Sequence, residues 1–182
     1  MRLFTAIELP SDIKKVILEK SMELAGPGIT LVKEEALHLT LHFFGEKSSE
    51  DAEKIKNALK EASWSAFKTN LYGISTFSPK FIKVIFVGVR EGSAEAIDLY
   101  NRLSLKLDAE RLSYEKERYT PHVTIARVKF ADKEKLLQFI NKYKDYSFGS
   151  FNVSSFYLIK STLTSSGPIY ERLYEFKPNG AF

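Results

Sequence analysis

The stretch "HLTL" at His38–Leu41 is followed 84 residues later by "HVTI" at His122–Ile125. Both stretches read histidine, spacer, threonine, aliphatic, and they use two of the three histidines in the chain. One His-x-Thr on a strand is more often a polar face than a site. Two copies in equivalent positions indicate an internal repeat with a shared function.

The segments around the two motifs recur in the same order. The first half has a strand pattern at 3–9, a helix from 11, the motif strand at 37–44, a helix after Ser49 and a strand at 67–74. The second half has a strand at 83–89, a helix over 96–107, the second motif strand, a helix capped near Asp132 and a strand at 151–159. A Gly167-Pro168 loop and a strand near 170–176 end the chain.

This order predicts an α+β fold with two lobes related by a pseudo-two-fold repeat. We expect a single bilobal domain over 1–182, with repeat units at about 1–80 and 81–165 and a C-terminal strand within 166–182. Each half is expected to form one lobe. Face-to-face packing of similar lobes would bring both motif strands to one central cleft, lined by antiparallel sheets with helices outside.

The composition excludes several kinds of site. The chain has no cysteine, so disulfides, thiolate catalysis and cysteine-bound zinc are absent. The net charge of +4 is compatible with a polyanionic partner, although the lysines are scattered. No apolar run is long enough to span a bilayer, and the N-terminal segment lacks a signal-peptide pattern. We therefore predict a cytoplasmic protein without a membrane partner.

Alternation along the motif strands separates a core face from a polar face. In 37–43 the residues Leu37, Leu39, Leu41 and Phe43 share one face, and His38, Thr40 and His42 share the other. In the second copy, Val123 and Ile125 are on the apolar face, opposite His122, Thr124 and Ala126. Each lobe thus presents one histidine and one threonine to the cleft.

Two histidines without a carboxylate cluster favour proton transfer, because imidazole titrates near neutral pH. One ring can accept a proton while the other donates one, and the threonine hydroxyls can bind the oxygens of a phosphoryl group. A metal site is the rival interpretation, but no Asp or Glu lies on either motif strand. We therefore predict metal-independent phosphodiester chemistry without a cofactor.

The chain resembles the two-histidine phosphoesterases, and among them the RNA 2′,3′-cyclic phosphodiesterases, also described as 2′-5′ RNA ligases. The resemblance covers essentially the whole chain. It rests on "HLTLHFFG" (38–45), "YTPHVTIARV" (119–128) and "STLTSSGPIYERL" (161–173), in the family's order and spacing.

The resemblance implies hydrolysis of a terminal 2′,3′-cyclic phosphate of RNA to a 2′-phosphate. It assigns His122 as the proton acceptor that activates water and His38 as the proton donor to the departing 3′ oxygen, with Thr40 and Thr124 holding the phosphate. It also implies a reverse 2′-5′ ligation of RNA ends such as tRNA halves. Symmetry alone leaves open which histidine is the acid.

Four further residues are predicted to bind substrate. By alternation, the Arg127 side chain is expected on the face of the strand opposite to His122, away from the cleft. It can reach phosphate only if the strand twists or ends there. His42 shares the predicted His38 face, although a structural role is the stronger reading. Phe44 is expected to face the cleft and stack on a base while Phe43 fills the core, and Tyr170 of "GPIY" is a second candidate for substrate contact.

Two other functions remain open. The chain can be a non-catalytic module that binds RNA ends, or a cyclic phosphodiesterase acting on small nucleotides. A bell-shaped pH profile would favour an enzyme, whereas binding without turnover would favour the module. We expect a monomer whose partner is RNA with a 2′,3′-cyclic phosphate end, including tRNA fragments.

Overall fold

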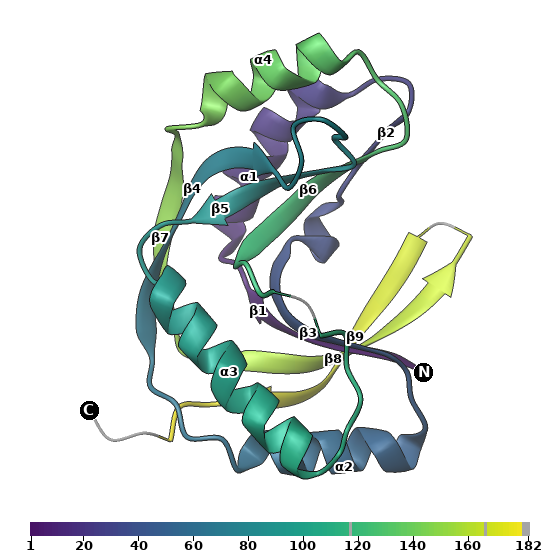
Figure 1. The fold of residues 1–182 in the computed structure, drawn as a ribbon, viewed down its shortest axis with the longest axis vertical. Helices are drawn as coiled ribbons and strands as arrows, with labels where there is room; N and C mark the ends of the chain where they lie inside the picture. Colours follow the sequence, from purple (N-terminus) through teal and green to yellow (C-terminus); the bar gives the residue numbers. More distant parts are fainter. Residues whose placement is uncertain (117, 166, 180–182) are drawn as a thin grey trace.

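The computed structural model describes residues 1–116, 118–165 and 167–179 (Figure 1). Within these ranges the chain forms nine strands, four α-helices and two short 3-10 helices. In chain order they are β1 (Arg2–Glu8), α1 (Ser11–Ser21), η1 (Met22–Leu24), β2 (Ile29–Leu31), η2 (Glu34–Ala36), β3 (His38–Glu46), α2 (Ser49–Lys60), β4 (Phe67–Thr76), β5 (Val84–Val89), α3 (Ser93–Ala109), β6 (His122–Val128), α4 (Lys133–Tyr143), β7 (Ser147–Val153), β8 (Phe156–Thr164) and β9 (Gly167–Phe176).

The strands form two antiparallel sheets. Sheet A has the order β3-β1-β8-β9, and sheet B has the order β2-β6-β5-β4-β7. One motif strand lies in each sheet, β3 in sheet A and β6 in sheet B. The predicted α+β fold with two lobes and a pseudo-two-fold repeat is confirmed.

The expectation that each half of the chain forms one lobe is wrong, because the halves exchange strands. The order β3-β1-β8 in sheet A matches β6-β5-β4 in sheet B, so each motif strand pairs with the first strand of its own half. The third strand in each case comes from the other half. Periodicity identifies strands but not their partners, and consecutive strands are neighbours only about two-thirds of the time.

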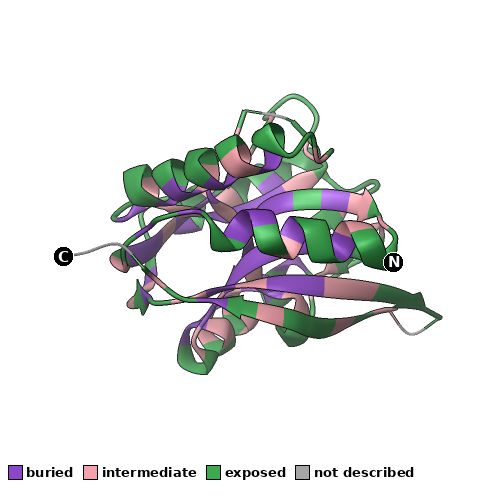
Figure 2. Ribbon diagram, turned by 90° about the horizontal axis from the view of Figure 1, so that it is seen from below, coloured by how far each residue is buried: buried purple, intermediate pink, exposed green. Residues whose placement is uncertain are grey.

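The helices are exchanged in the same way. Helix α1, from the first half, lies against β6 and β7 of sheet B, and α4 lies against β4. Helix α2 contacts β9 of sheet A, and α3 packs on α2. The helices carry buried residues on the side facing the sheets and exposed residues on the other (Figure 2). Within the described residues, no helix has the length and apolar character needed to cross a membrane.

Side-chain caps fix the start of two helices. The Ser48 hydroxyl accepts from the Asp51 backbone N–H, and the Asp51 carboxylate accepts from the Ser48 backbone, which forms a capping box. The cap is therefore Ser48, one residue before the predicted Ser49. Asp132 caps α4 as predicted, accepting from the backbone N–H groups of Glu134 and Lys135.

Candidate active site

Both motif strands face one cleft between the sheets. His38 and Thr40 of β3, together with His122 and Thr124 of β6, line a single cavity of about 550 Å³. The residues between and after them in each motif are buried in the core. The structure thus brings the four residues predicted to be catalytic into one site from opposite sheets.

Each motif strand contains a β-bulge directly after its threonine. The extra residue is Leu41 on β3 and Ile125 on β6, since the residues on either side pair with consecutive residues of the neighbouring strand. An extra residue shifts the alternation of side chains by one position. The strict alternation predicted for 37–43 therefore ends at Leu41.

The bulge reverses the predicted roles of two phenylalanines. Phe43 is 45% exposed and lines the cleft, whereas Phe44 is 4% exposed and packs in the core. The prediction that Phe44 faces the cleft is wrong because the shift in parity turns its side chain inward. Phe43 takes the position in the cleft that was predicted for Phe44.

The same shift on β6 turns Arg127 toward the cleft. Arg127 is exposed and lines the cavity with the two histidines. In a strand without a bulge, the Arg127 side chain would lie on the face opposite to His122. The extra residue at Ile125 shifts the alternation by one, so that Arg127 lies on the same face as His122. Tyr170 also lines the cavity, with its ring edge on the His38 ring at 5.6 Å between centroids.

His42 does not lie in the cleft, so the prediction that it contacts substrate is wrong. The bulge turns it into the core, where it is 1% exposed and stacks on Tyr100 at 4.3 Å between centroids. Its Nε2 pairs with the Ser104 hydroxyl at 2.9 Å, and its Nδ1 has no partner among the described residues. Burial lowers the pKa of His42 to about 3, against a smaller opposing effect of Asp108.

This burial makes the fold sensitive to acid. The pKa of His42 is lower in the folded state than in the unfolded chain, so stability is lost as pH falls below about 6.5 toward 3. From pH 7.5 to 4.5 the wild type should lose about 2 to 3 kcal/mol relative to His42→Phe, which keeps a flat ring but cannot titrate. Denaturant unfolding at both pH values measures this. If the difference in unfolding free energy between the wild type and His42→Phe is the same at both pH values, the prediction is contradicted.

His122 is held in one tautomer by the backbone. Its Nδ1 lies 2.7 Å from the Thr120 carbonyl oxygen, which can only accept, so Nδ1 carries the proton in the neutral ring. Nε2 is then left with its lone pair. Burial lowers the pKa of His122, with a smaller opposing effect of the Thr120 hydrogen bond and a further lowering by Arg127. Phe77 and Phe86 pack against the ring.

His38 has a different environment. Its ring stacks on Phe4 at 4.9 Å between centroids, and among the described residues neither ring nitrogen has a hydrogen-bond partner. Burial, with a smaller contribution from the positive charge of Lys14, lowers the pKa of His38 to about 4. The two histidines thus occupy unequal sites, although the strands that carry them are related by the repeat.

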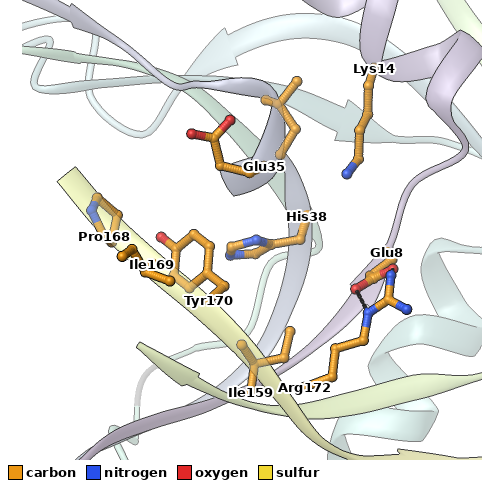
Figure 3. A pocket seen from close by; sticks show the side chains of 10 residues that line it. Glu8, Lys14, Glu35, His38, Ile159, Pro168, Ile169, Tyr170 and Arg172 are labelled. Carbon is orange, nitrogen blue, oxygen red and sulfur yellow. Dashed lines mark hydrogen bonds and ion pairs between the residues drawn. The ribbon is translucent and has the colours of Figure 1, made fainter. Parts of the chain in front are cut away.

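A second cavity, of about 410 Å³, adjoins the cleft on the far side of His38 (Figure 3). Lys14 reaches into it from α1, and the Tyr170 ring lies beside His38 on the β9 side. An ion pair between Glu8 and Arg172, with Nε of Arg172 2.6 Å from Oε1 of Glu8, borders this cavity. His38 is therefore accessible from two directions.

A side-chain hydrogen bond joins the first motif to the segment that leads into the second. The Tyr119 hydroxyl, from the segment preceding β6, donates to the backbone oxygen of Thr40 at 3.1 Å. Tyr119 also stacks on Tyr100 at 4.3 Å. This contact ties the backbone of the first motif to the chain segment that leads into the second.

Among the residues around the site that the sequence did not point to are Phe43, Phe77 and Lys14. Phe43 was assigned to the core from alternation alone. Phe77 follows β4 in a loop and Lys14 lies in a helix, and neither carries a local pattern that points to a cleft. Within the described ranges, no group of three or more His, Asp or Glu side chains is arranged to hold a metal ion.

Comparisons with known proteins agree with this geometry. The model of the 2′-5′ RNA ligase superfamily matches residues 20–164. An RNA 2′,3′-cyclic phosphodiesterase of Methanocaldococcus jannaschii is 42% identical over 179 residues, covering 96% of this chain and 99% of the relative. A protein of the same name from Thermotoga maritima is 38% identical, covering 96% of this chain and 94% of the relative.

Solved structures share the fold over nearly the full length. The crystal structure of TT0787 of Thermus thermophilus superposes with a TM-score of 0.82 at 25% identity, covering 100% of both chains. E. coli LigT complexed with 3′-AMP superposes with a TM-score of 0.79 at 23% identity, covering 98% of both chains. At 23% identity the likeness to LigT concerns the fold alone.

Proposed function

Because this chain belongs to the 2′-5′ RNA ligase superfamily, we propose that it hydrolyses 2′,3′-cyclic phosphate ends of RNA to 2′-phosphates. The named activity of the relatives from M. jannaschii and T. maritima supports the reaction class. The observation that carries the mechanism is the convergence of His38, Thr40, His122 and Thr124 on one cleft.

His122 is the general base in this proposal. The Thr120 carbonyl fixes the proton on Nδ1, so Nε2 of the neutral ring is free to take a proton from water. The lowered pKa of His122 keeps the ring neutral at pH 7. This asymmetry supports a direction of proton transfer that the repeated motif alone leaves open.

His38 is the general acid. In the free protein its pKa of about 4 leaves the ring neutral at pH 7, so it must gain a proton when substrate binds. The negative charge of a cyclic phosphate beside the ring would raise the pKa of His38. The water oxygen then bonds to phosphorus while the bond to the 3′ oxygen breaks. His122 takes the proton from water, and His38 gives its proton to the 3′ oxygen.

Thr40, Thr124 and Arg127 bind the phosphate. Neither threonine hydroxyl has a hydrogen-bond partner within the described part of the chain, and both threonines line the cleft. Each can donate to a non-bridging oxygen whose charge grows in the transition state. Arg127 adds a positive charge on the same face, which favours an anionic substrate.

The finer assignments stand as part of the same proposal. The reverse reaction, in which a 5′-hydroxyl RNA end replaces water and a 2′ oxygen leaves, uses the same two histidines, but abundant water favours hydrolysis. We also propose a monomeric enzyme of the cytoplasm that acts on RNA fragments such as tRNA halves.

The test is hydrolysis of a short RNA ending in a 2′,3′-cyclic phosphate, with EDTA present and the product identified. We expect a 2′-phosphate at a rate that EDTA does not change. A 3′-phosphate product would contradict the assigned leaving group, and loss of activity in EDTA would contradict the metal-independent mechanism. Tight binding without turnover would favour a non-catalytic RNA-end-binding module.

A further inference from the structure

Two exposed aromatic side chains lie at one end of sheet B. Phe81, in the loop between β4 and β5, is 75% exposed, and Phe130, just after β6, is 66% exposed. Figure 1 shows this loop beside the end of β6 and close to β2. Exposed phenylalanines on a globular domain cost free energy unless a partner covers them, so such a pair indicates a binding surface.

The same two segments carry only positive charge. Between 76 and 89, and between 119 and 131, the chain has no Asp or Glu, and the basic residues are Lys80, Lys83, Arg127 and Lys129. Lys80 and Lys129 are exposed and have no ion pair among the described residues. Unpaired lysines beside exposed aromatic rings are typical of surfaces that bind single-stranded nucleic acid.

This surface is continuous with the active-site cleft. The β4–β5 loop begins at Phe77 and leads into Val84, the first residue of β5, and both residues line the cleft. Val84 pairs with Arg127 in the neighbouring strand. Lys129 follows Arg127 by two positions and is the first residue beyond the end of β6. His122 and Arg127 on β6 and Lys129 just beyond its end therefore follow one another along the chain, leading away from the cleft.

Backbone contacts hold the surface in place before any ligand binds. The Val128 N–H donates to the Lys83 carbonyl at 2.9 Å, and the Lys129 N–H donates to the Gly28 carbonyl at 2.8 Å. A Cβ at Gly28 would stand 2.1 Å from the Phe130 carbonyl oxygen and 2.7 Å from its ring, so only glycine lets residue 130 pack this closely. The aromatic surface is thus built into the end of the sheet.

We propose that Lys80, Phe81, Lys129 and Phe130, here called the rim patch, bind the nucleotides that precede the terminal cyclic phosphate. The ligand class is single-stranded RNA, with bases stacked on the two rings and backbone phosphates near the two lysines. This inference rests on the proposed function. It names an oligonucleotide, rather than a small cyclic nucleotide, as the preferred substrate.

The experiment compares kcat/KM for a 2′,3′-cyclic mononucleotide with kcat/KM for an unpaired RNA of about ten nucleotides ending in the same group. The wild type should prefer the RNA. In Phe81→Ala/Phe130→Ala, kcat/KM for the RNA divided by kcat/KM for the mononucleotide should fall about fivefold or more. The reason is that the bases lose their stacking on the two rings. In Lys80→Ala/Lys129→Ala the log–log salt dependence of RNA hydrolysis should become shallower by about one.

Control variants come from helices α2 and α3, which pack on sheet A rather than at the rim patch. Leu105→Ala removes a side chain that is 70% exposed on α3, and Lys54→Ala/Lys60→Ala removes two exposed charges on α2. Both should keep the wild-type ratio. An unchanged ratio in the rim-patch variants, or an equal fall for both substrates, would overturn the rim patch as an RNA site. Hydrolysis of neither substrate by the wild type would instead overturn the proposed function.

Discussion

Replacing either His38 or His122 by alanine is expected to lower kcat for cyclic-phosphate hydrolysis about 10²- to 10⁴-fold. The double replacement should be little worse than either single one, because a proton donor without its acceptor gives no coupled transfer. Single-turnover kinetics on folded variants measures both effects. Losses that multiply in the double variant would contradict a coupled pair.

The third histidine supplies the control for this experiment. His42→Phe changes a buried ring that contacts Tyr100 and lies outside the cleft, so kcat per folded molecule should stay within about tenfold of the wild type. A loss as large as that of the cleft histidines would contradict the division of the three histidines into two catalytic residues and one structural residue.

The direction of proton transfer has its own test. An aryl phosphodiester releases a phenolate, which leaves without being protonated, so hydrolysis of this substrate needs a base but no acid. His38→Ala should therefore hydrolyse it at nearly the wild-type rate, while His122→Ala should remain inactive. The opposite pattern would assign the base to His38, despite the hydrogen bond from His122 to the Thr120 carbonyl.

The sequence predicted the residues of the site better than the direction in which side chains point. The alternation of apolar residues predicts the two motif strands. The internal repeat predicts that both strands line one cleft. The bulges at Leu41 and Ile125 leave no mark in the pattern, because an extra apolar residue reads as one more strand position. The shift at Leu41 accounts for the errors at Phe44 and His42, and the shift at Ile125 accounts for the access of Arg127 to the cleft.

The exchange of strands and helices between the two halves of the chain could not be predicted from the sequence either. The residues of β4 alternate as they would in a strand of either sheet. The local sequence does not indicate that β4 pairs with β5 and β7 rather than with β1. The choice is made by packing of distant segments, including the burial of α1 against sheet B. The exchange has a consequence for function, because neither half of the chain can form its side of the cleft alone.

Thr40→Val and Thr124→Val are each expected to lower kcat about 10²- to 10³-fold, as does removal of one donor from an oxyanion-binding site. Valine has nearly the shape of threonine but carries a methyl group where the hydroxyl was, so the bulge and the buried aliphatic neighbours can persist. The effect should fall on kcat more than on KM, because the donated hydrogen bond strengthens as charge grows on the phosphoryl oxygens.

Serine at the same positions is the matched control, because it keeps the hydroxyl and loses only a methyl group. Thr40→Ser and Thr124→Ser should recover most of the activity that valine loses, and unfolding free energies should show that all four variants are folded. If the valine and serine variants lose the same factor in kcat, the threonines contribute packing rather than a hydrogen bond. If valine raises KM alone, the hydroxyls bind the substrate and the transition state equally, and stabilisation of the transition state must come from the histidines and Arg127.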